Sequence, residues 1–248
     1  MQWLNLAFSL ALLIFCSSAL ANLPETISKI KPSIVGVGIY SKLAAPRAKL
    51  QGTGFVVSSH LIATNAHVVD QKSLQGHDNF VVFVGHGKKT DVRSAQVVSR
   101  DITHDLALLK VSGPALKPVV LSSRQVKEGE LYSFTGFPIG AILGLYPATH
   151  RGIISSITPI AIPARNAKEL TPKQLKQLKQ PYFVYQFDAT AYPGNSGSPV
   201  YHPITGDVIA VINKVLVKST RESALTSPSA ITYAIPISHL QALLAKQR

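Results

Sequence analysis

The sequence predicts an all-β protein built as a sandwich or a barrel. Short runs rich in β-branched residues recur along the chain, separated by clusters of Gly, Pro, Ser and Asn. This spacing is typical of strands joined by tight turns. A hydrophobic fraction of 46% with 15% charged residues suits a packed core and argues against disorder. The runs cover residues 33–40, 54–57, 80–84, 95–99, 131–135, 183–189 and 208–217.

A helix is predicted at the C-terminal end, over about residues 238–246. Ser238 is placed to cap its first turn, because a serine side chain accepts hydrogen bonds from free helical N–H groups. Leu240, Leu243 and Leu244 would then share one face of the helix. That face is expected to pack on the β-structure.

A basic segment interrupts the strand pattern at residues 163–181, which hold five Lys or Arg residues and one acid. Within it, Thr171-Pro172-Lys173-Gln174 has the form of a capping box and predicts a short helix over about 172–180. One interpretation is a surface for an anionic partner such as a lipid, a polysaccharide or an acidic protein. The other is a solvated lysine-rich loop.

A candidate nucleophile lies in the segment Tyr192-Pro193-Gly194-Asn195-Ser196-Gly197-Ser198-Pro199-Val200. Ser196 is flanked by Gly194 and Gly197, which allow unusual backbone dihedral angles in a tight turn. Such a turn exposes the hydroxyl and directs backbone N–H groups toward a developing oxyanion. The same composition is common in ordinary surface turns, so this segment alone leaves both interpretations open.

Two upstream segments supply a candidate base and a candidate acid. His67 lies in residues 64–69 after an apolar run, and Asp105 lies at the start of the apolar run in residues 104–111. The chain order histidine, aspartate, serine is that of the chymotrypsin plan, whereas subtilisins and α/β-hydrolases use other orders. The three segments together favour acyl-transfer chemistry.

On these segments the chain resembles a trypsin-like serine protease of the chymotrypsin fold, most closely the HtrA branch. It has a secondary similarity to the bacterial glutamyl endopeptidases. Further matching segments extend the resemblance over nearly all of the chain after residue 21. They are residues 23–37, 52–56, 136–140, 151–155 and 233–236.

The resemblance implies two six-stranded antiparallel β-barrels within a protease domain of residues 22–248. The N-terminal barrel would span about residues 30–125 and the C-terminal barrel about 126–237, followed by the helix. His67 and Asp105 would come from the first barrel and Ser196 from the second. The chain length leaves no room for the PDZ domain that usually follows in HtrA proteases.

The mechanism implied by the resemblance is peptide hydrolysis through an acyl-enzyme. His67 would be the general base, Asp105 would orient it, and Ser196 would be the nucleophile. Residues Gly194, Asn195 and Ser196 would form the oxyanion hole through the backbone N–H groups of Gly194 and Ser196. Because these donors are main-chain atoms, the side chain at position 195 is expected to vary freely. No cofactor or metal ion is expected.

Other titratable residues are rival candidates for the same roles. His60, His104 and His150 could each be the base, and Asp101 could be the acid. Their flanking residues do not match the family segments, so they are expected to be surface or loop residues.

The substrate pocket of this fold begins six residues before the nucleophile, at Thr190, with Ala191 beside it. Ile212 and Asn213 would lie in the strand that forms its wall. None of these residues is acidic, which disfavours cleavage after Lys or Arg. Ile212 stands near the place where glutamyl endopeptidases carry a histidine, which disfavours cleavage after Glu. A small or medium apolar side chain is therefore expected at P1, the residue before the cleaved bond.

Residues 1–21 are predicted to be a secretory signal peptide, because a mostly apolar run ends in Ala19-Leu20-Ala21. The alternative is a retained membrane anchor, although the run is shorter than the roughly 20 residues of a spanning helix. The only cysteine, Cys16, lies in this leader, so the mature chain would contain no disulfide. A periplasmic or secreted location follows from cleavage.

The net charge of +13 favours encounters with acidic partners. Nucleic-acid binding is not expected, because no helix-turn-helix, zinc or RNP-like motif accompanies the charge. Two functions of different classes remain. The first is an exported serine endopeptidase that acts on proteins or peptides, including unfolded ones. The second is a catalytically silent protease-like scaffold that binds peptides or protein partners.

Overall fold

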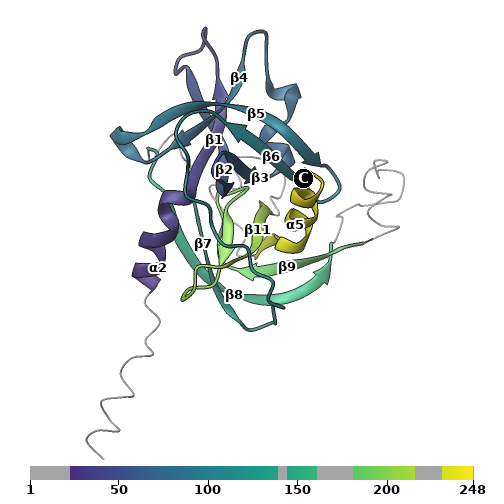
Figure 1. Ribbon diagram of the computed structural model, residues 1–248. Helices are drawn as coiled ribbons and strands as arrows, with labels where there is room; N and C mark the ends of the chain where they lie inside the picture. Colours follow the sequence, from purple (N-terminus) through teal and green to yellow (C-terminus); the bar gives the residue numbers. More distant parts are fainter. Residues whose placement is uncertain (1–22, 139–143, 161–180, 216–230, 248) are drawn as a thin grey trace, which may run out of the picture.

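The chain forms two closed antiparallel β-barrels that pack against each other, as shown by a computed structural model (Figure 1). The structure describes residues 23–138, 144–160, 181–215 and 231–247. The first barrel has the strand order β1-β2-β3-β6-β5-β4, and the second repeats this order as β7-β8-β9-β12-β11-β10. The predicted all-β fold with two six-stranded barrels is therefore confirmed.

The strands of the first barrel are β1 (Ile34–Tyr40), β2 (Ala48–Ser58), β3 (Leu61–Thr64), β4 (Asn79–Val84), β5 (Asp91–Asp101) and β6 (Leu106–Val111). Those of the second barrel are β7 (Leu131–Gly136), β8 (Ala148–Pro159), β9 (Phe183–Asp188), β10 (Pro199–Tyr201), β11 (Val208–Val215) and β12 (Ile231–Pro236). Four short 3-10 helices occur in the connections of the N-terminal half, namely η2 (Lys31–Ser33), η3 (Ala66–Val69), η4 (Gln71–Ser73) and η5 (Gly87–Lys89).

Three apolar cores hold this architecture together. Successive side chains of a strand point to opposite faces, so one strand can serve two cores. In β6, Leu106 and Leu108 contribute to the core between the barrels, while Ala107 and Leu109 fill the interior of the first barrel. Strand β11 behaves in the same way, with Val211 in the core between the barrels. The barrels are therefore joined by a continuous hydrophobic contact, and the loops at its edge are held in fixed positions.

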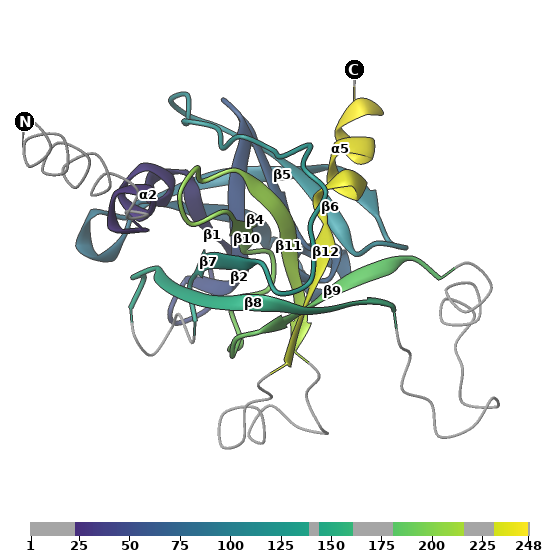
Figure 2. The same ribbon diagram turned by 90° about the horizontal axis from the view of Figure 1, so that it is seen from below.

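The C-terminal helix α5 (Ile237–Ala245) lies beside both barrels in Figures 1 and 2. Its Leu240 and Leu243 are buried in the core between the barrels, which confirms the predicted apolar face. The predicted cap at Ser238 is wrong. The helix begins at Ile237, directly after β12, and Pro236 occupies the N-cap position without a side-chain hydrogen bond. The helix therefore begins where Ile237 is buried, and no polar side chain caps its first turn.

A second helix, α2 (Leu23–Ile30), precedes β1 and packs Ile30 against the same core. No helix within the described residues is both long and apolar enough to cross a membrane. The predicted basic helix at 172–180 and the leader at 1–21 lie outside the described residues.

Candidate active site

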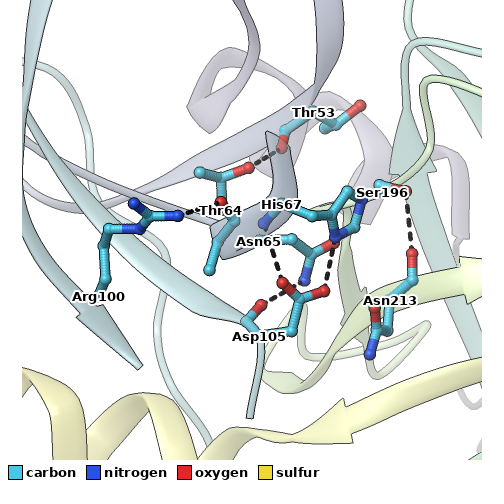
Figure 3. A network of polar contacts seen from close by, with 9 residues as sticks. Thr53, Thr64, Asn65, His67, Arg100, Asp105, Ser196 and Asn213 are labelled. Atoms are coloured by element: carbon cyan, nitrogen blue, oxygen red, sulfur yellow. Dashed lines mark hydrogen bonds and ion pairs between the residues drawn. The ribbon is translucent and has the colours of Figure 1, made fainter. Parts of the chain in front are cut away.

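His67 and Asp105 form a close pair at one end of the first barrel. His67 lies on η3, just after β3, and Asp105 lies just before β6. The imidazole Nδ1 is 2.6 Å from Asp105 Oδ2, and the backbone N–H of His67 donates to Asp105 Oδ1 at 2.9 Å (Figure 3). One carboxylate therefore holds both the ring and the main chain of the histidine. This contact favours the tautomer that carries its proton on Nδ1 and leaves Nε2 free to accept one.

The backbone of Asp105 is itself held in an unusual conformation. Its φ angle is +54°, in the left-handed region that aspartate tolerates better than most residues. The carbonyl of Asp105 accepts hydrogen bonds from the side-chain amide of Asn65 at 3.0 Å and from the N–H of Ala66 at 3.1 Å. Asn65 is fully buried. The segment around His67 thus fixes the residue that pairs with the imidazole.

Ser196 lies in a tight turn that leads into β10. Gly194 and Gly197 flank it with φ angles of +101° and +88°, so both glycines are required by the backbone. The turn packs on β2, since a Cβ atom at Gly52 would lie 2.9 Å from Ser196 O and 2.8 Å from Val68 Cγ2. Val68 follows His67 in the chain. The turn that carries Ser196 and the helix η3 that carries His67 therefore both pack against Gly52.

The Ser196 hydroxyl donates a hydrogen bond to the backbone carbonyl of Asn213 at 2.9 Å. In the view of Figure 3 the His67 ring lies between Asp105 and Ser196, while the hydroxyl points toward Asn213. The hydroxyl proton is therefore held by a main-chain acceptor on β11. A rotation about the serine χ1 angle would redirect it.

The backbone N–H groups of Gly194 and Ser196 are candidates for binding an anionic oxygen. Neither of them donates to a backbone carbonyl within the described residues. The intervening N–H of Asn195 is occupied, because it donates to Tyr192 O at 3.0 Å. The turn thus leaves two donors available in the alternating positions that an oxyanion hole uses.

The side chain of Asn195 is fully buried, and neither polar atom of its amide has a hydrogen-bond partner among the residues that the structure describes. The expectation that this side chain varies freely is therefore wrong. Its Oδ1 would lie 2.9 Å from a Cβ atom at Gly136, so the amide packs under the turn against β7.

The four predicted pocket residues have different environments. Ala191 and Ile212 are buried and belong to the apolar core inside the second barrel. Thr190 and Asn213 are partly exposed. The hydrogen bond from Ser196 to the Asn213 carbonyl places β11, the strand expected to form the pocket wall, next to Ser196. Cleavage preference remains a prediction.

The rival histidines lie in other environments. His60 is exposed, and its ring contacts Ser59 Oγ and Gly113 O at 3.2 Å. His150 lies on β8 and stacks on Phe134 with 4.7 Å between the ring centres. Burial lowers the pKa of His150. Neither ring forms an ion pair with a carboxylate among the described residues.

A second Asp–His pair was not expected from the sequence. His104 Nδ1 lies 2.6 Å from Asp101 Oδ2, and the His104 ring stacks on His239 of α5 at 3.8 Å. Tyr182 packs its ring edge-on against both histidines. These partly buried rings link the first barrel to α5. His104 lies in the turn before β6, as expected for a loop residue, and Asp101 ends β5, but the contacts of their side chains were not expected. The contact with α5 joins residues far apart in the sequence, and no local pattern signals it.

The surroundings of this second cluster shift the pKa values of His239 and Asp101. The pKa of His239 is lowered to about 4, mainly by burial and also by the neighbouring His104, while Asp101 acts in the opposite direction. Burial raises the pKa of Asp101, but hydrogen bonds from His104 outweigh this effect and hold the pKa below its usual value. Within the described part of the chain, no group of three or more His, Cys, Asp or Glu residues is arranged to hold a metal ion.

Comparison with known proteins agrees with this geometry. Residues 52–211 match the model of the trypsin-like peptidase domain. Serine protease HTRA4 of Homo sapiens is 30% identical over 227 residues, which are 89% of this chain and 40% of that protein. Serine protease Rv3671c of Mycobacterium tuberculosis is 31% identical over 198 residues, covering 78% of this chain and 43% of that protein. This chain thus spans about two fifths of the length of these relatives.

Solved structures show the same fold. The active form of the Rv3671c protease from M. tuberculosis superposes with a TM-score of 0.65 at 25% identity, covering 93% of this chain and 86% of that one. The HtrA-type protease AlgWS227A with a tripeptide gives a TM-score of 0.65 at 23% identity over 90% of this chain and 62% of its own, a similarity that concerns the fold alone. Since the domain model covers well over half of the sequence, the chain belongs to the trypsin-like peptidase family and is related to the HtrA serine proteases.

Proposed function

We propose that the protein is an exported serine endopeptidase in which Ser196 is the nucleophile, His67 the general base and Asp105 the residue that orients His67. The observation that carries the proposal is the double contact of Asp105 with the ring and backbone of His67 at the barrel junction that also holds the Ser196 turn. A structural ion pair needs no serine turn at the same junction, whereas acyl transfer needs a nucleophile close to its base.

The reaction begins when the Ser196 hydroxyl leaves the Asn213 carbonyl and turns toward Nε2 of His67. The imidazole takes the hydroxyl proton as Oγ attacks the scissile carbonyl, and Asp105 stabilises the resulting imidazolium. The carbonyl oxygen becomes an oxyanion that accepts hydrogen bonds from the N–H groups of Gly194 and Ser196. The C–N bond breaks as His67 returns the proton to the leaving amine. Water then hydrolyses the acyl-enzyme by the same steps in reverse order.

The substrates we propose are peptides or unfolded proteins with a small or medium apolar residue at P1. The support is the absence of a charged side chain among Thr190, Ala191, Ile212 and Asn213, together with the buried apolar position of Ala191 and Ile212. Export is proposed from the apolar leader at residues 1–21 and its Ala19-Leu20-Ala21 end. The basic segment 163–181 is proposed as a surface that meets an anionic partner.

Digestion of casein tests this function. Wild-type protein is expected to cleave casein, and the Ser196→Ala and His67→Ala variants are expected to lose the activity by a factor of about 10⁴ or more, because the triad acts as a unit. Ser198→Ala and His60→Ala are matched controls. Ser198 is a buried neighbouring hydroxyl without a partner, and His60 is an exposed histidine of the same barrel as His67.

Sequencing of the cleavage products reports the P1 preference. Cuts after Val, Ala, Leu or Thr would support the proposed pocket, and cuts confined to Lys, Arg or Glu would contradict it. If the folded wild type binds casein without cleaving it, the endopeptidase proposal fails and the protease-like scaffold takes its place.

A further inference from the structure

One threonine of the first barrel is bonded to the nucleophile turn of the second. Thr53 lies in β2 and is fully buried. Its hydroxyl donates to Gly194 O at 2.7 Å, and its backbone N–H donates to Ser196 O at 2.8 Å. The same hydroxyl accepts the N–H of Phe137 at 3.0 Å. Thr53 therefore holds the carbonyls on both sides of Asn195.

These bonds restrict the peptide planes of the turn. A peptide unit is planar, so fixing a carbonyl also fixes the N–H of the next residue. The Gly194 carbonyl shares its plane with the N–H of Asn195, and the Ser196 carbonyl shares its plane with the N–H of Gly197. Both of these N–H groups are bonded in turn, to Tyr192 O and Ile212 O. The peptide that carries the N–H of Ser196 lies between these two fixed planes, and its own carbonyl, Asn195 O, accepts the N–H of Ser198 at 3.0 Å.

Other buried polar side chains near the turn do not provide this support. The amide of Asn195 and the hydroxyl of Ser198 are buried, and they have no hydrogen-bond partner among the described residues. Gly136 leaves the space in which these groups and Thr53 meet, since a Cβ atom there would lie 2.9 Å from Thr53 Oγ1. The side-chain hydrogen bond to the turn therefore comes from Thr53.

We propose that Thr53 is a positioning residue that sets the orientation of the oxyanion-binding N–H of Ser196 from the opposite barrel. The inference rests on the proposed function, because it needs Ser196 to be the nucleophile. Thr53 does not touch the reacting atoms. It acts through the carbonyl of Gly194, and it links the geometry of the turn to the packing of the two barrels.

Thr53→Val tests the role, because valine has nearly the same shape but neither donates to Gly194 O nor accepts from Phe137 N. We expect kcat for a peptide substrate to fall about 10- to 100-fold with KM nearly unchanged, since a misplaced donor weakens transition-state binding most. Affinity for a peptide boronate, whose tetrahedral adduct occupies the oxyanion hole, should fall in parallel. Thr53→Ser keeps the hydroxyl and is expected to restore both values to within about threefold of wild type.

Thr135→Val is the matched control for lost stability. Thr135 is fully buried in β7, and its hydroxyl bonds with Thr149 Oγ1 at 2.8 Å and Tyr201 OH at 2.7 Å, so valine again removes two hydrogen bonds. Urea unfolding should show a similar loss of stability for both valine variants, while Thr135→Val should keep the wild-type kcat.

The outcomes separate this proposal from the proposed function. Wild-type kcat in folded Thr53→Val, a Thr53→Ser variant as impaired as Thr53→Val, or an equal loss of kcat in Thr135→Val would each overturn the positioning role while leaving the protease function intact. A wild-type protein that neither hydrolyses the peptide nor binds the boronate would overturn both proposals.

Discussion

The stacked pair of His104 and His239 predicts a loss of stability in mildly acidic solution. His239 is partly buried on α5, and its pKa is lowered from 6.5 to about 4. In the unfolded chain its pKa returns to the ordinary value, so between these two values the unfolded state binds more protons than the folded state. The free energy of unfolding must therefore decrease as the pH falls through this window.

The size of the decrease in unfolding free energy follows from the pKa shift of His239. Each pKa unit corresponds to about 1.4 kcal/mol, so His239 contributes a decrease of at most about 3 kcal/mol, and partial exposure reduces it to about 1–3 kcal/mol. Asp101 adds little to this effect, because its pKa is held below the usual value and the carboxyl titrates mostly at lower pH. The pKa of His150 is also lowered by burial, so the comparison must isolate His239 by substitution.

Urea unfolding at pH 7, 5.5 and 4.5 measures the effect. His239→Phe keeps an aromatic ring against His104 and Tyr182 but cannot be protonated, so its unfolding free energy should decrease less than that of wild type. His77→Asn is the control, because His77 is exposed and makes no ring contact within the described residues. Parallel pH dependences for wild type and His239→Phe would refute the reasoning.

Two further substitutions test the site and its packing. Asparagine in Asp105→Asn also tolerates a φ angle of +54°, but it cannot stabilise the imidazolium. The kcat should therefore fall about 10³- to 10⁴-fold without a large change in melting temperature. Retained activity would argue against the role of Asp105. Gly136→Ala places a Cβ atom 2.9 Å from both Asn195 Oδ1 and Thr53 Oγ1 and against Ser198 Oγ, which should lower the unfolding free energy by about 1–3 kcal/mol in urea. An unchanged urea midpoint would show that the space beside Gly136 can accept an extra methyl group without loss of stability.

The all-β fold was predictable from the strong local signals of its strands, whereas the division into two six-stranded barrels followed from the resemblance to trypsin-like proteases. Runs such as 80–84 and 131–135 combine β-branched or aromatic residues with flanking turn residues, and both lie in strands. The predicted runs do not include β3, β8, β10 and β12. Strand β8 shows no simple alternation of buried and exposed residues, and β10 is only three residues long. Pairing with neighbouring strands defines such elements, and single-sequence patterns do not report this pairing.

The site was predictable where a local motif carries the chemistry. His67, Asp105 and Ser196 each lie in a short segment whose residue types suit one catalytic role. The contacts that hold these segments are long-range, as between Thr53 and Gly194 or between His104 and His239, and no local pattern predicts them. The error at Ser238 has a similar cause, because tertiary burial of Ile237 determines where α5 begins.

The most direct test of the central claim is labelling of the mature protein with a fluorophosphonate probe, followed by mass spectrometry of the peptide that carries the adduct. The probe reacts with a serine hydroxyl that a neighbouring base has activated. We expect one adduct, on Ser196, that is absent in Ser196→Ala and strongly reduced in His67→Ala. A folded wild-type protein that remains unlabelled, or an adduct on another residue that persists in Ser196→Ala, would contradict the assignment of Ser196 as the nucleophile.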